Sequence, residues 1–575
     1  MDAALNDEAV ENLVTQFSSS LDFYRELVQN SIDAGSSSVD VWMEFEPGDG
    51  VDGTIAIHVD DFGEGMNEEI IDNQLTQLFS SSKENDLTKI GKFGIGFVSV
   101  FALRPRGVLV HTGRDGECWE VFFDQDRSFV KSRLDTPVEG TQITMFLEGG
   151  RGRYRELVRG TRESLTKWCS HSDTEISFED RSPAGSEEGG LESINAPFVV
   201  EADVAVHVEH PGTEISVGFS HAPVYGFYNK GLALAVTSAG NEILESRAGR
   251  FRHIGFKIKS RYLEHTLSRE TVMRDANFDK AMALLEQAIA GPLRTAVADA
   301  LERVCAAREW ALADRTRYET LLGYLAAEPR ESLGDLGPRA ILRTVDGRAL
   351  RLDDAKRAFD RHGRVFVADA PSALTATLVR HRIPVFLGGG LRLGEVAREP
   401  VSRVLAGYLW LRWRSEPTGM ARRLLGQDLL EMVEARVVHP ESVFVHVQVL
   451  HDVSPDVAGL ISDAAAVLRA SKQRYGDILP GSLDGGPGEP CLFAMGSKLG
   501  SVMQRGVAGF YDRGWFERPA VVVDTEHAHV RELLKLRENH RGMAAYCLAK
   551  AMLLEENRNL DEDQALAQAA MEVVR

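Results

Sequence analysis

Hydrophobic and polar positions alternate along the chain in a way that predicts a mixed α+β protein. Residues 8–35 repeat apolar positions at helical spacing and end at Gly35, which predicts a first helix. The segment SVDVWMEFE alternates as a strand does and breaks at PGDGVDG, whose composition is typical of a turn. TIAIHVDDFGEGM then predicts a second strand that runs into a glycine-rich turn.

The same pattern continues to about residue 180. IGKFGIGFVSVFAL has the form of a glycine-punctuated loop that enters an apolar helix, and GVLVHTG, CWEVFFD and GTQITMFL predict further strands of an antiparallel sheet. Residues 181–195, RSPAGSEEGGLESIN, are polar and rich in glycine and serine. We therefore predict a first α+β domain at residues 1–180, followed by a linker at 181–195.

Two further domains are predicted beyond this linker. Residues 196–395 contain the strand-like segments AVHVEHP, LALAVTS and IGFKIKS, then a long helical region from Phe278 to Leu312 and a smaller αβ segment. Residues 396–575 mix helices and strands, with a flexible insert from Pro480 to Pro490 and a strongly helical end. We predict a middle domain and a C-terminal domain with these boundaries.

Composition narrows the classes of function. The 575 residues carry 65 Lys and Arg against 86 Asp and Glu, a net charge of −21, which argues against nucleic acid as a partner while leaving a local basic groove open. No run of 18 apolar residues occurs and the N-terminus is acidic, so neither membrane insertion nor export is expected. The five scattered cysteines lack CxxC spacing and indicate reduced thiols in the cytoplasm.

The first helix carries a candidate catalytic pair. Glu26 and Asn30 are four residues apart and share one helix face, with Asp33 one turn further. A carboxylate and a carboxamide on such a face can hold a water molecule and a divalent cation side by side, and Mg²⁺ needs few protein oxygens because it keeps several waters. The alternative is an amphipathic helix on which both side chains face solvent.

Two glycine-rich segments follow this helix. In DDFGEGM, Asp61 lies at a strand end and can accept a hydrogen bond from an adenine amino group, while Gly63 and Gly65 let the backbone approach a flat ligand. In GKFGIGF the glycines precede an apolar helix, where backbone N–H groups cradle phosphates. This order differs from a Walker A loop. Taken singly, each segment could also be an ordinary glycine turn.

Together, the three segments resemble the N-box and the two glycine boxes of the GHKL ATPase superfamily, which includes DNA gyrase, heat-shock protein 90, histidine kinases and MutL. EGTQITMFL, residues 139–147, is similar to the final pocket strand of that superfamily. The resemblance implies an N-terminal Bergerat α/β sandwich that binds ATP with Mg²⁺, and it implies Asn30 as the metal ligand. The nucleotide-binding positions that it implies are Asn30, Asp33, Asp61, Gly65, Met66, Lys83, Gly91, Lys92, Phe93, Gly94, Ile95, Gly96, Phe97 and Thr141.

Further resemblances indicate the heat-shock protein 90 (HtpG-type) branch. HTLSRETV resembles the LNxSRE segment of its middle domain, which implies that Arg269 neutralises charge on the γ-phosphate; the alternative is a surface helix cap. Glu26 indicates hydrolysis, because histidine kinases generally lack this carboxylate. RPAVVVDTEHAHVRELLKL resembles the entry to the C-terminal dimerisation domain, with a turn, not a metal site, at its histidines. The resemblance thus implies a slow ATPase with Glu26 and Arg269 as catalytic residues, acting as a homodimeric cytoplasmic chaperone on client proteins.

Several positions depart from that pattern. Lys92 replaces the usual Gln of the second glycine box, Thr266 replaces an Asn, and Met273 lies near the position of another Gln. The phosphate-contacting lysine of the lid, which we predict at residues 67–90, is Lys83, although an ungapped alignment puts Ser80 there. These departures bear on the rate of hydrolysis more than on nucleotide binding. Two alternatives therefore stay open: an ATPase clamp on nucleic acid in DNA repair, chromatin-like compaction or phage defence, and a non-hydrolysing nucleotide-sensing scaffold.

Overall fold

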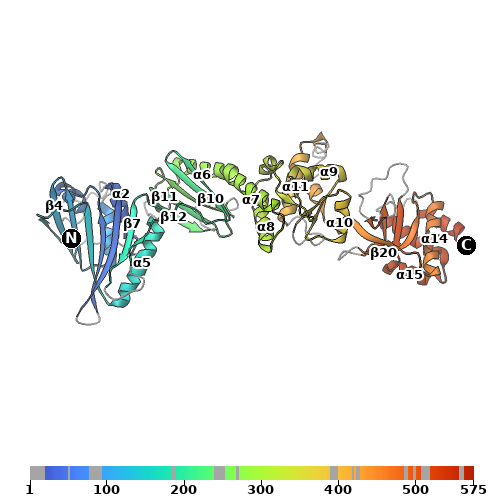
Figure 1. Ribbon diagram of the computed structural model, residues 1–575, viewed down its shortest axis with the longest axis horizontal. Coiled ribbons are helices and arrows are strands. Elements are labelled where there is room, and N and C mark those ends of the chain that lie inside the picture. Colours follow the sequence, from blue (N-terminus) through green and yellow to red (C-terminus); the bar gives the residue numbers. More distant parts are fainter. Residues whose placement is uncertain are drawn as a thin grey trace, which may run out of the picture. The chain divides into compact units, whose positions relative to one another are not determined.

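An eight-stranded sheet forms the centre of the N-terminal part of the chain in the computed structural model (Figure 1). The structure describes residues 20–48, 52–76, 94–182, 190–238, 251, 253–266, 271–388, 399–417, 420–421, 428–484, 490–496, 500–506, 519–555 and 563–574. By its internal contacts the chain divides into two units, Met1–Leu293 and Arg294–Arg575. The predicted domain boundaries stay predictions, and the division between units falls inside the predicted middle domain.

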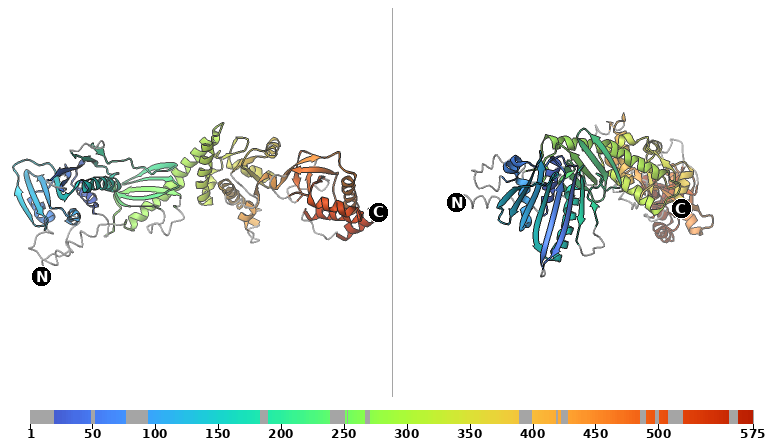
Figure 2. Two further views of the ribbon diagram at one scale, coloured as in Figure 1. Left: turned by 90° about the horizontal axis from the view of Figure 1, so that it is seen from below. Right: turned by 60° about the vertical axis from the view of Figure 1, so that its left-hand side comes forward.

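The first sheet has the strand order β5-β4-β3-β6-β2-β1-β7-β8, and the right-hand view of Figure 2 shows its long neighbouring strands in blue. It is antiparallel except where β1 runs parallel to β7. The strands are β1 (Ser38–Pro47), β2 (Gly53–Asp61), β3 (Gly107–Arg114), β4 (Glu117–Asp124), β5 (Phe129–Arg133), β6 (Thr141–Gly149), β7 (Glu175–Asp180) and β8 (Glu192–Ser193).

Helices pack on the apolar side of this sheet. Strand β1 alternates buried and half-buried residues, so that Val39, Val41, Met43 and Phe45 all point into one core. Phe23 and Leu27 of the first described helix share that core. The helical segments are α2 (Phe23–Asp33), α3 (Glu68–Ile70), the π-helix Ile71–Leu75, α4 (Gly94–Val98), the 3-10 helix Ser99–Leu103 and α5 (Arg151–Cys169). An α+β sandwich results, as the sequence predicts.

A second, five-stranded sheet completes the first unit, in the order β12-β11-β13-β10-β9. Its strands are β9 (Val204–His210), β10 (Thr213–Phe219), β11 (Val224–Asn229), β12 (Leu232–Ser238) and β13 (Ile254–Ser260), followed by α6 (Ala276–Ala288) and the π-helix Ile289–Leu293. Leu232 is 1% exposed and belongs to the core of the first sheet. The second sheet therefore contributes a buried side chain to the core of the first.

The C-terminal end of the predicted linker, residues 181–195, is part of the first sheet and its core. Glu192–Ser193 pairs with β7 as an edge strand, and Ile194 is buried in the first core. The Asn195 amide accepts a hydrogen bond from the Ile176 N–H at 2.7 Å and donates to the Ser172 and Thr174 carbonyls. Ile194 anchors this stretch to the core, and the polar composition around it gave no sign of that burial in the sequence.

The second unit begins with helices and a small parallel sheet. The strand order of that sheet is β17-β16-β18, and β14 and β15 form a separate hairpin. The elements are α7 (Arg294–Ala306), α8 (Leu312–Ala327), the 3-10 helix Arg330–Leu336, β14 (Leu342–Arg343), β15 (Ala349–Leu350), α9 (Leu352–His362), β16 (Val365–Ala368), α10 (Ala373–Arg380), β17 (Val385–Leu387), α11 (Pro400–Trp413), α13 (Leu429–Glu434), β18 (Val437–Val438) and the 3-10 helix Pro440–Ser442.

The long helical region predicted from Phe278 to Leu312 consists of α6, the π-helix Ile289–Leu293, α7 and the first residue of α8. Pro292 lies inside the π-helix between α6 and α7. A proline has no N–H to donate to the α-helical hydrogen-bond pattern, which accounts for the local change of helix type. Residues 307–311 then separate α7 from α8. The region is therefore helical, as predicted, except at residues 307–311.

A closed five-stranded barrel, β19-β20-β23-β21-β22, precedes the C-terminal helices. Its elements and the helices around it are β19 (Phe444–Val449), α14 (Pro455–Ala470), β20 (Ile478–Asp484), β21 (Phe493–Gly496), β22 (Val502–Arg505), β23 (Ala520–Asp524), α15 (Ala528–Arg537), α16 (Arg541–Glu555) and α17 (Asp563–Val573). Residues Pro480–Asp484 lie within β20, so the insert predicted from Pro480 does not begin there.

A turn at residues 525–526 connects β23 to α15, as predicted, with His527 as the N-cap of α15 and His529 in its first turn. The His527 ring caps α15, its Nδ1 accepting a hydrogen bond from the His529 N–H at 3.2 Å. No group of three or more His, Cys, Asp or Glu side chains suited to a metal ion occurs in the described part of the chain. Among those same residues, no helix is both long and apolar enough to cross a membrane.

Candidate functional site

A cavity of about 270 Å³ opens beside α2 in the first unit, close to the lower end of the roughly 300–1,000 Å³ of small-molecule sites. Its walls come from the C-terminal half of α2, the ends of β2 and β6, the glycine turn after β2, and the π-helix Ile71–Leu75. The lining residues are Leu27, Asn30, Ser31, Asp33, Ala34, Val59, Asp61, Glu64, Gly65, Met66, Ile70, Gln74, Leu75, Phe97, Val110, Arg114, Thr141 and Ile143.

Asp61 is the polar anchor of this cavity. It ends β2 and is only 8% exposed. Its Oδ1 accepts hydrogen bonds from the N–H groups of Gly63 at 2.9 Å and Thr141 at 3.2 Å, and its Oδ2 accepts from the Ser31 hydroxyl at 3.2 Å. Burial raises the pKa of the carboxyl above its ordinary value of 3.8, although these hydrogen bonds oppose the shift. Such a carboxylate is held in place and can receive one further donor from the cavity.

Two hydroxyls extend this polar wall. Thr112 and Thr141 lie opposite each other on β3 and β6, with 3.0 Å between their Oγ1 atoms. The Thr112 hydroxyl donates to the Gly140 carbonyl at 3.1 Å and accepts from the Met66 N–H at 2.8 Å. Thr112 thereby ties the glycine turn to the sheet, while Thr141 lines the cavity beside Asp61.

The glycines of DDFGEGM serve mainly backbone packing. Gly65 has φ +63°, and a Cβ on it would lie 2.1 Å from the Gly113 carbonyl oxygen. A Cβ on Gly63 would lie 2.8 Å from the Cβ of Ala34, at the end of α2. We predicted these glycines from their access to a ligand, but their first requirement is the close approach of three backbone segments.

Glu26 lies on the buried side of α2 and is 8% exposed, which excludes the solvent-facing alternative for this residue. A Cβ on Gly96 would stand 2.9 Å from Glu26 Oε2, so the carboxylate reaches the start of α4. Glu26 is not among the residues that line the cavity, whereas Asn30, one turn further along α2, is. The helix thus presents the carboxylate toward α4 and the carboxamide toward the cavity.

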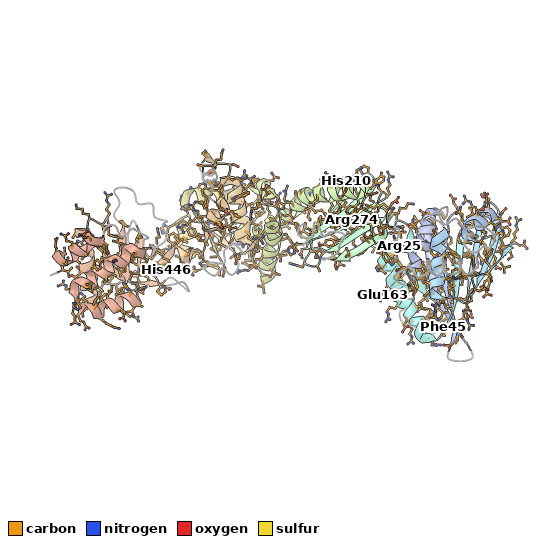
Figure 3. The ribbon with its side chains drawn as sticks, turned by 180° about the vertical axis from the view of Figure 1, so that it is seen from behind. Arg25, Phe45, Glu163, His210, Arg274 and His446 are labelled. Atoms are coloured by element: carbon orange, nitrogen blue, oxygen red, sulfur yellow. The ribbon has the colours of Figure 1, made fainter. Side chains whose placement is uncertain are left out.

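Contacts with α5 hold α2 in this orientation. Arg25, labelled in Figure 3, is 7% exposed and its guanidinium lies 5.2 Å from the centre of the Trp168 ring. The Tyr24 hydroxyl lies 2.9 Å from the Thr161 hydroxyl, and the Trp168 indole N–H donates to Asp22 at 2.9 Å. The residues that precede Glu26 are therefore fixed against α5.

Asp33 lies at the end of α2 and lines the same cavity. Its carboxylate accepts hydrogen bonds from the Gln29 amide at 3.0 Å and from the Lys230 ammonium at 2.9 Å. Gly35 follows with φ +72° and ends the helix, as predicted.

Several polar residues of the cavity and its wall were not predicted from the sequence, among them Ser31, Thr112 and Arg114. Thr112 had a readable signal, since its hydroxyl lies on the apolar face of a strand next to Val110. Arg114 pairs with Glu64 at 2.8 Å, a contact between segments far apart in sequence that periodicity does not show.

Several predicted positions lie outside the described residues: Lys83 and its alternative Ser80, then Gly91, Lys92, Phe93 and the catalytic candidate Arg269. Gly94 and Ile95 are described for their backbone, at the start of α4. Met66 and Phe97 line the cavity as expected, together with Gly65. Of the predicted lid at 67–90, the described part is the helical segment up to residue 76, and Ile71 within it is fully buried.

This fold and this cavity define an N-terminal ATPase domain of the GHKL superfamily. Residues 23–145 match the family described as histidine kinase-, DNA gyrase B-, and HSP90-like ATPase. The chain is also similar to the chaperone protein HtpG of Coxiella burnetii, from strain RSA 331 / Henzerling II and from strain RSA 493 / Nine Mile phase I. Each is 28% identical over 182 residues, which cover 26% of this chain and 27% of the relative. The chain thus matches about a quarter of the length of these relatives.

Proposed function

We propose that this protein is an ATP-dependent chaperone of the heat-shock protein 90 type, which hydrolyses ATP slowly and acts on client proteins as a cytoplasmic homodimer. The observation that carries the proposal is that Asp61, whose carboxyl is buried, lines the same cavity as Thr141 and Asn30. The similarity to HtpG proteins supports the chaperone branch over the other branches of the superfamily.

In this proposal Asp61 accepts a hydrogen bond from the adenine amino group. Its hydrogen bonds with Ser31, Gly63 and Thr141 fix the orientation of the carboxylate before the ligand arrives, which lowers the entropic cost of binding. The apolar residues Val59, Val110 and Ile143 offer the walls that a flat base needs. The phosphates then extend toward the N-terminus of α4, where backbone N–H groups favour anions.

Asn30 is the residue that would hold Mg²⁺. Asn30 lines the cavity, and its amide oxygen is a neutral ligand of the kind that this ion accepts, which nucleotide phosphates and water would supplement. When bound, the ion neutralises charge on the phosphates. The donor set therefore fits a cation that arrives with the nucleotide.

Glu26 is the proposed general base. Its carboxylate lies against Gly96 at the start of α4, within a wall that the proposal assigns to the phosphates. There it would accept a proton from the attacking water, a role that requires hydrogen-bond reach in the closed state. Arg269 would stabilise the developing phosphate charge once the segment that carries it docks on the site.

The first test is steady-state ATP hydrolysis by the purified protein and by Glu26→Ala, each with Mg²⁺, alongside nucleotide binding by calorimetry. We expect slow turnover that the substitution abolishes and binding that it leaves nearly intact. Hydrolysis retained in Glu26→Ala would overturn the general-base assignment. Tight binding without turnover in the wild-type protein would favour the nucleotide-sensing scaffold.

A second assay separates the chaperone from other ATPases of the superfamily. We expect the protein to suppress aggregation of a thermally unfolded model client in an ATP-dependent way and to sediment as a dimer. Salt-sensitive DNA binding without client protection would instead indicate the nucleic-acid clamp.

A further inference from the structure

The turn between β11 and β12 reaches the helix that carries the nucleotide pocket. Lys230 in this turn donates to Asp33 Oδ1 at 2.9 Å, although the two residues are 197 positions apart. Asp33 lines the cavity, one helical turn beyond Asn30. A charged side chain of the second sheet is thereby paired with a carboxylate of the pocket.

The backbone of this turn is fixed in place by its neighbours. Gly231 has φ +83°, and a Cβ on it would lie 1.9 Å from the His171 carbonyl oxygen, so the turn packs tightly against the end of α5. Leu232 is buried in the first core, and the Asn229 amide donates to the Leu263 carbonyl at 2.7 Å. The backbone at Lys230 is therefore already ordered by these contacts. Pairing with Asp33 costs only the conformational entropy of the lysine side chain.

The charges around the cavity explain why Asp33 needs a cation beside it. Among the described lining residues, three carboxylates (Asp33, Asp61 and Glu64) accompany one guanidinium, that of Arg114. Glu64 pairs with Arg114 at 2.8 Å, and Asp61 accepts three hydrogen bonds. Asp33 adds its negative charge to that of Asp61, and a polyanionic ligand would be repelled by Asp33 if this carboxylate had no cation beside it.

We propose that Lys230 is the counter-ion of Asp33 and that this pairing keeps the pocket receptive to the phosphates of a nucleotide. The inference rests on the proposed function, since it concerns the affinity of the same cavity for ATP. In this role Lys230 acts through Asp33 as a positioning and charge-compensating residue and does not touch the ligand. The second sheet thus supplies a determinant of binding to the ATPase domain.

The expected effect is modest, because the side chains of Lys230 and Asp33 are 49% and 29% exposed and solvent screens the pair. Removing the ammonium should weaken ATP binding about fivefold, the factor that an exposed ion pair supports. The effect should shrink as salt is raised, since screening reduces repulsion between Asp33 and the phosphates.

The experiment measures Kd for ATP and for adenosine, which lacks phosphates, using full-length Lys230→Arg, Lys230→Met and Lys230→Glu. We expect ATP affinity to fall in that order while adenosine affinity stays constant. Lys259→Met is the matched control, because Lys259 pairs with Asp173 at 3.1 Å and with Glu214 in the same unit but does not line the cavity. This control should bind both ligands as the wild type does.

A double-mutant cycle tests whether Lys230 acts through Asp33. In an Asp33→Asn background, Lys230→Met should no longer change ATP affinity, because the carboxylate that it neutralises is gone. A loss that persists in that background, or an equal loss of adenosine binding, would overturn the counter-ion role. Binding of neither ligand by the wild type would overturn the proposed function and this inference together, whereas wild-type binding with an unaffected Lys230→Met would overturn the inference alone.

Discussion

Asp61 is the residue on which recognition of the base depends. Its Oδ1 is committed to two backbone N–H groups, which leaves Oδ2 and the Ser31 hydroxyl at the cavity. The one proton of the Ser31 hydroxyl can also turn to the Leu27 carbonyl, 3.0 Å away, and in that orientation the hydroxyl oxygen can accept a hydrogen bond from a different neighbour without leaving its position.

We predict that Asp61→Asn folds normally and loses nucleotide affinity. The amide oxygen can keep the two backbone hydrogen bonds, and the amide N–H can donate to Ser31, but the cavity then faces the adenine amino group with a second donor. A lost hydrogen bond to a charged group corresponds to roughly 10- to 100-fold in affinity. Calorimetric titration with ATP measures the change, and Ser31→Ala, which keeps the carboxylate, should lose much less.

The pH dependence gives an independent readout of the same carboxyl. Because burial raises its pKa above the ordinary 3.8, protonation begins at a higher pH than for a surface aspartate, and affinity should fall as the pH drops through that raised value. Stability moves in the opposite direction, since a raised folded-state pKa makes protonation favour the folded state. An affinity that stays constant on acidification would contradict the assignment of Asp61.

For individual residues, the sequence predicted the cavity residues that lie in recognisable motifs. It did not predict those that reach the cavity through tertiary contacts. Asp61, Asn30 and Thr141, which the family resemblance implies as nucleotide-binding positions, all line the cavity. The Arg114–Glu64 pair joins a strand end to a turn, and such proximity is created by the fold. Arg269 stays a prediction, because it lies outside the described residues.

Among the elements, the glycine turn after β2 shows how backbone packing shapes the pocket. The carbonyl oxygens of Gly113 and Gly140 both lie within 2.8 Å of where a Gly65 Cβ would be. The turn therefore sits flush on the ends of β3 and β6, and this contact places Met66 at the cavity wall.

We predict that Gly65→Ala destabilises the protein by more than about 2 kcal/mol, because it adds a backbone clash to the roughly 1–2 kcal/mol of a left-handed non-glycine residue. Gly116→Ala is the matched control: Gly116 also has positive φ, +79°, but no atom lies within 4 Å of its added Cβ. Denaturant unfolding measures both variants. Equal losses would mean that backbone conformation alone, and not the packing of the turn, requires glycine at position 65.

The periodicity of the sequence predicted the strands of the first sheet and the helices packed on it. It did not predict how the segments between them are anchored. The alternation in β1 and β2 is complete enough to predict both the strands and their buried faces. The burial of Ile194 depended on tertiary packing, which outweighs the composition of a short segment.

On the scale of the whole molecule, the two units have separate hydrophobic cores. The first contains Phe23, Val41 and Met145, and the second contains Leu460, Val530 and Leu548. The barrel in the second unit was not predicted, because its closure needs the parallel pairing of β20 with β23, which are distant along the chain.

We predict that nucleotide stabilises the first unit selectively. Scanning calorimetry should show two transitions, and ATP with Mg²⁺ at about 100 times its Kd should stabilise one of them by about 2.7 kcal/mol while leaving the other in place. Asp61→Asn is the control, and its transitions should not respond to ATP. A uniform shift of both transitions would mean that the units unfold as one cooperative body.

Leu232 has a consequence for how the gene for this protein can change. Its side chain completes a core whose other members, such as Leu165 and Phe178, are encoded far upstream. A recombination event that joined residues 1–195 to a different partner sequence would remove this leucine from the ATPase core and leave a cavity, at a loss of roughly 2–5 kcal/mol. The ATPase domain and the β11–β12 turn must therefore be inherited as one piece, and the smallest fragment that could be transplanted intact extends past the second sheet.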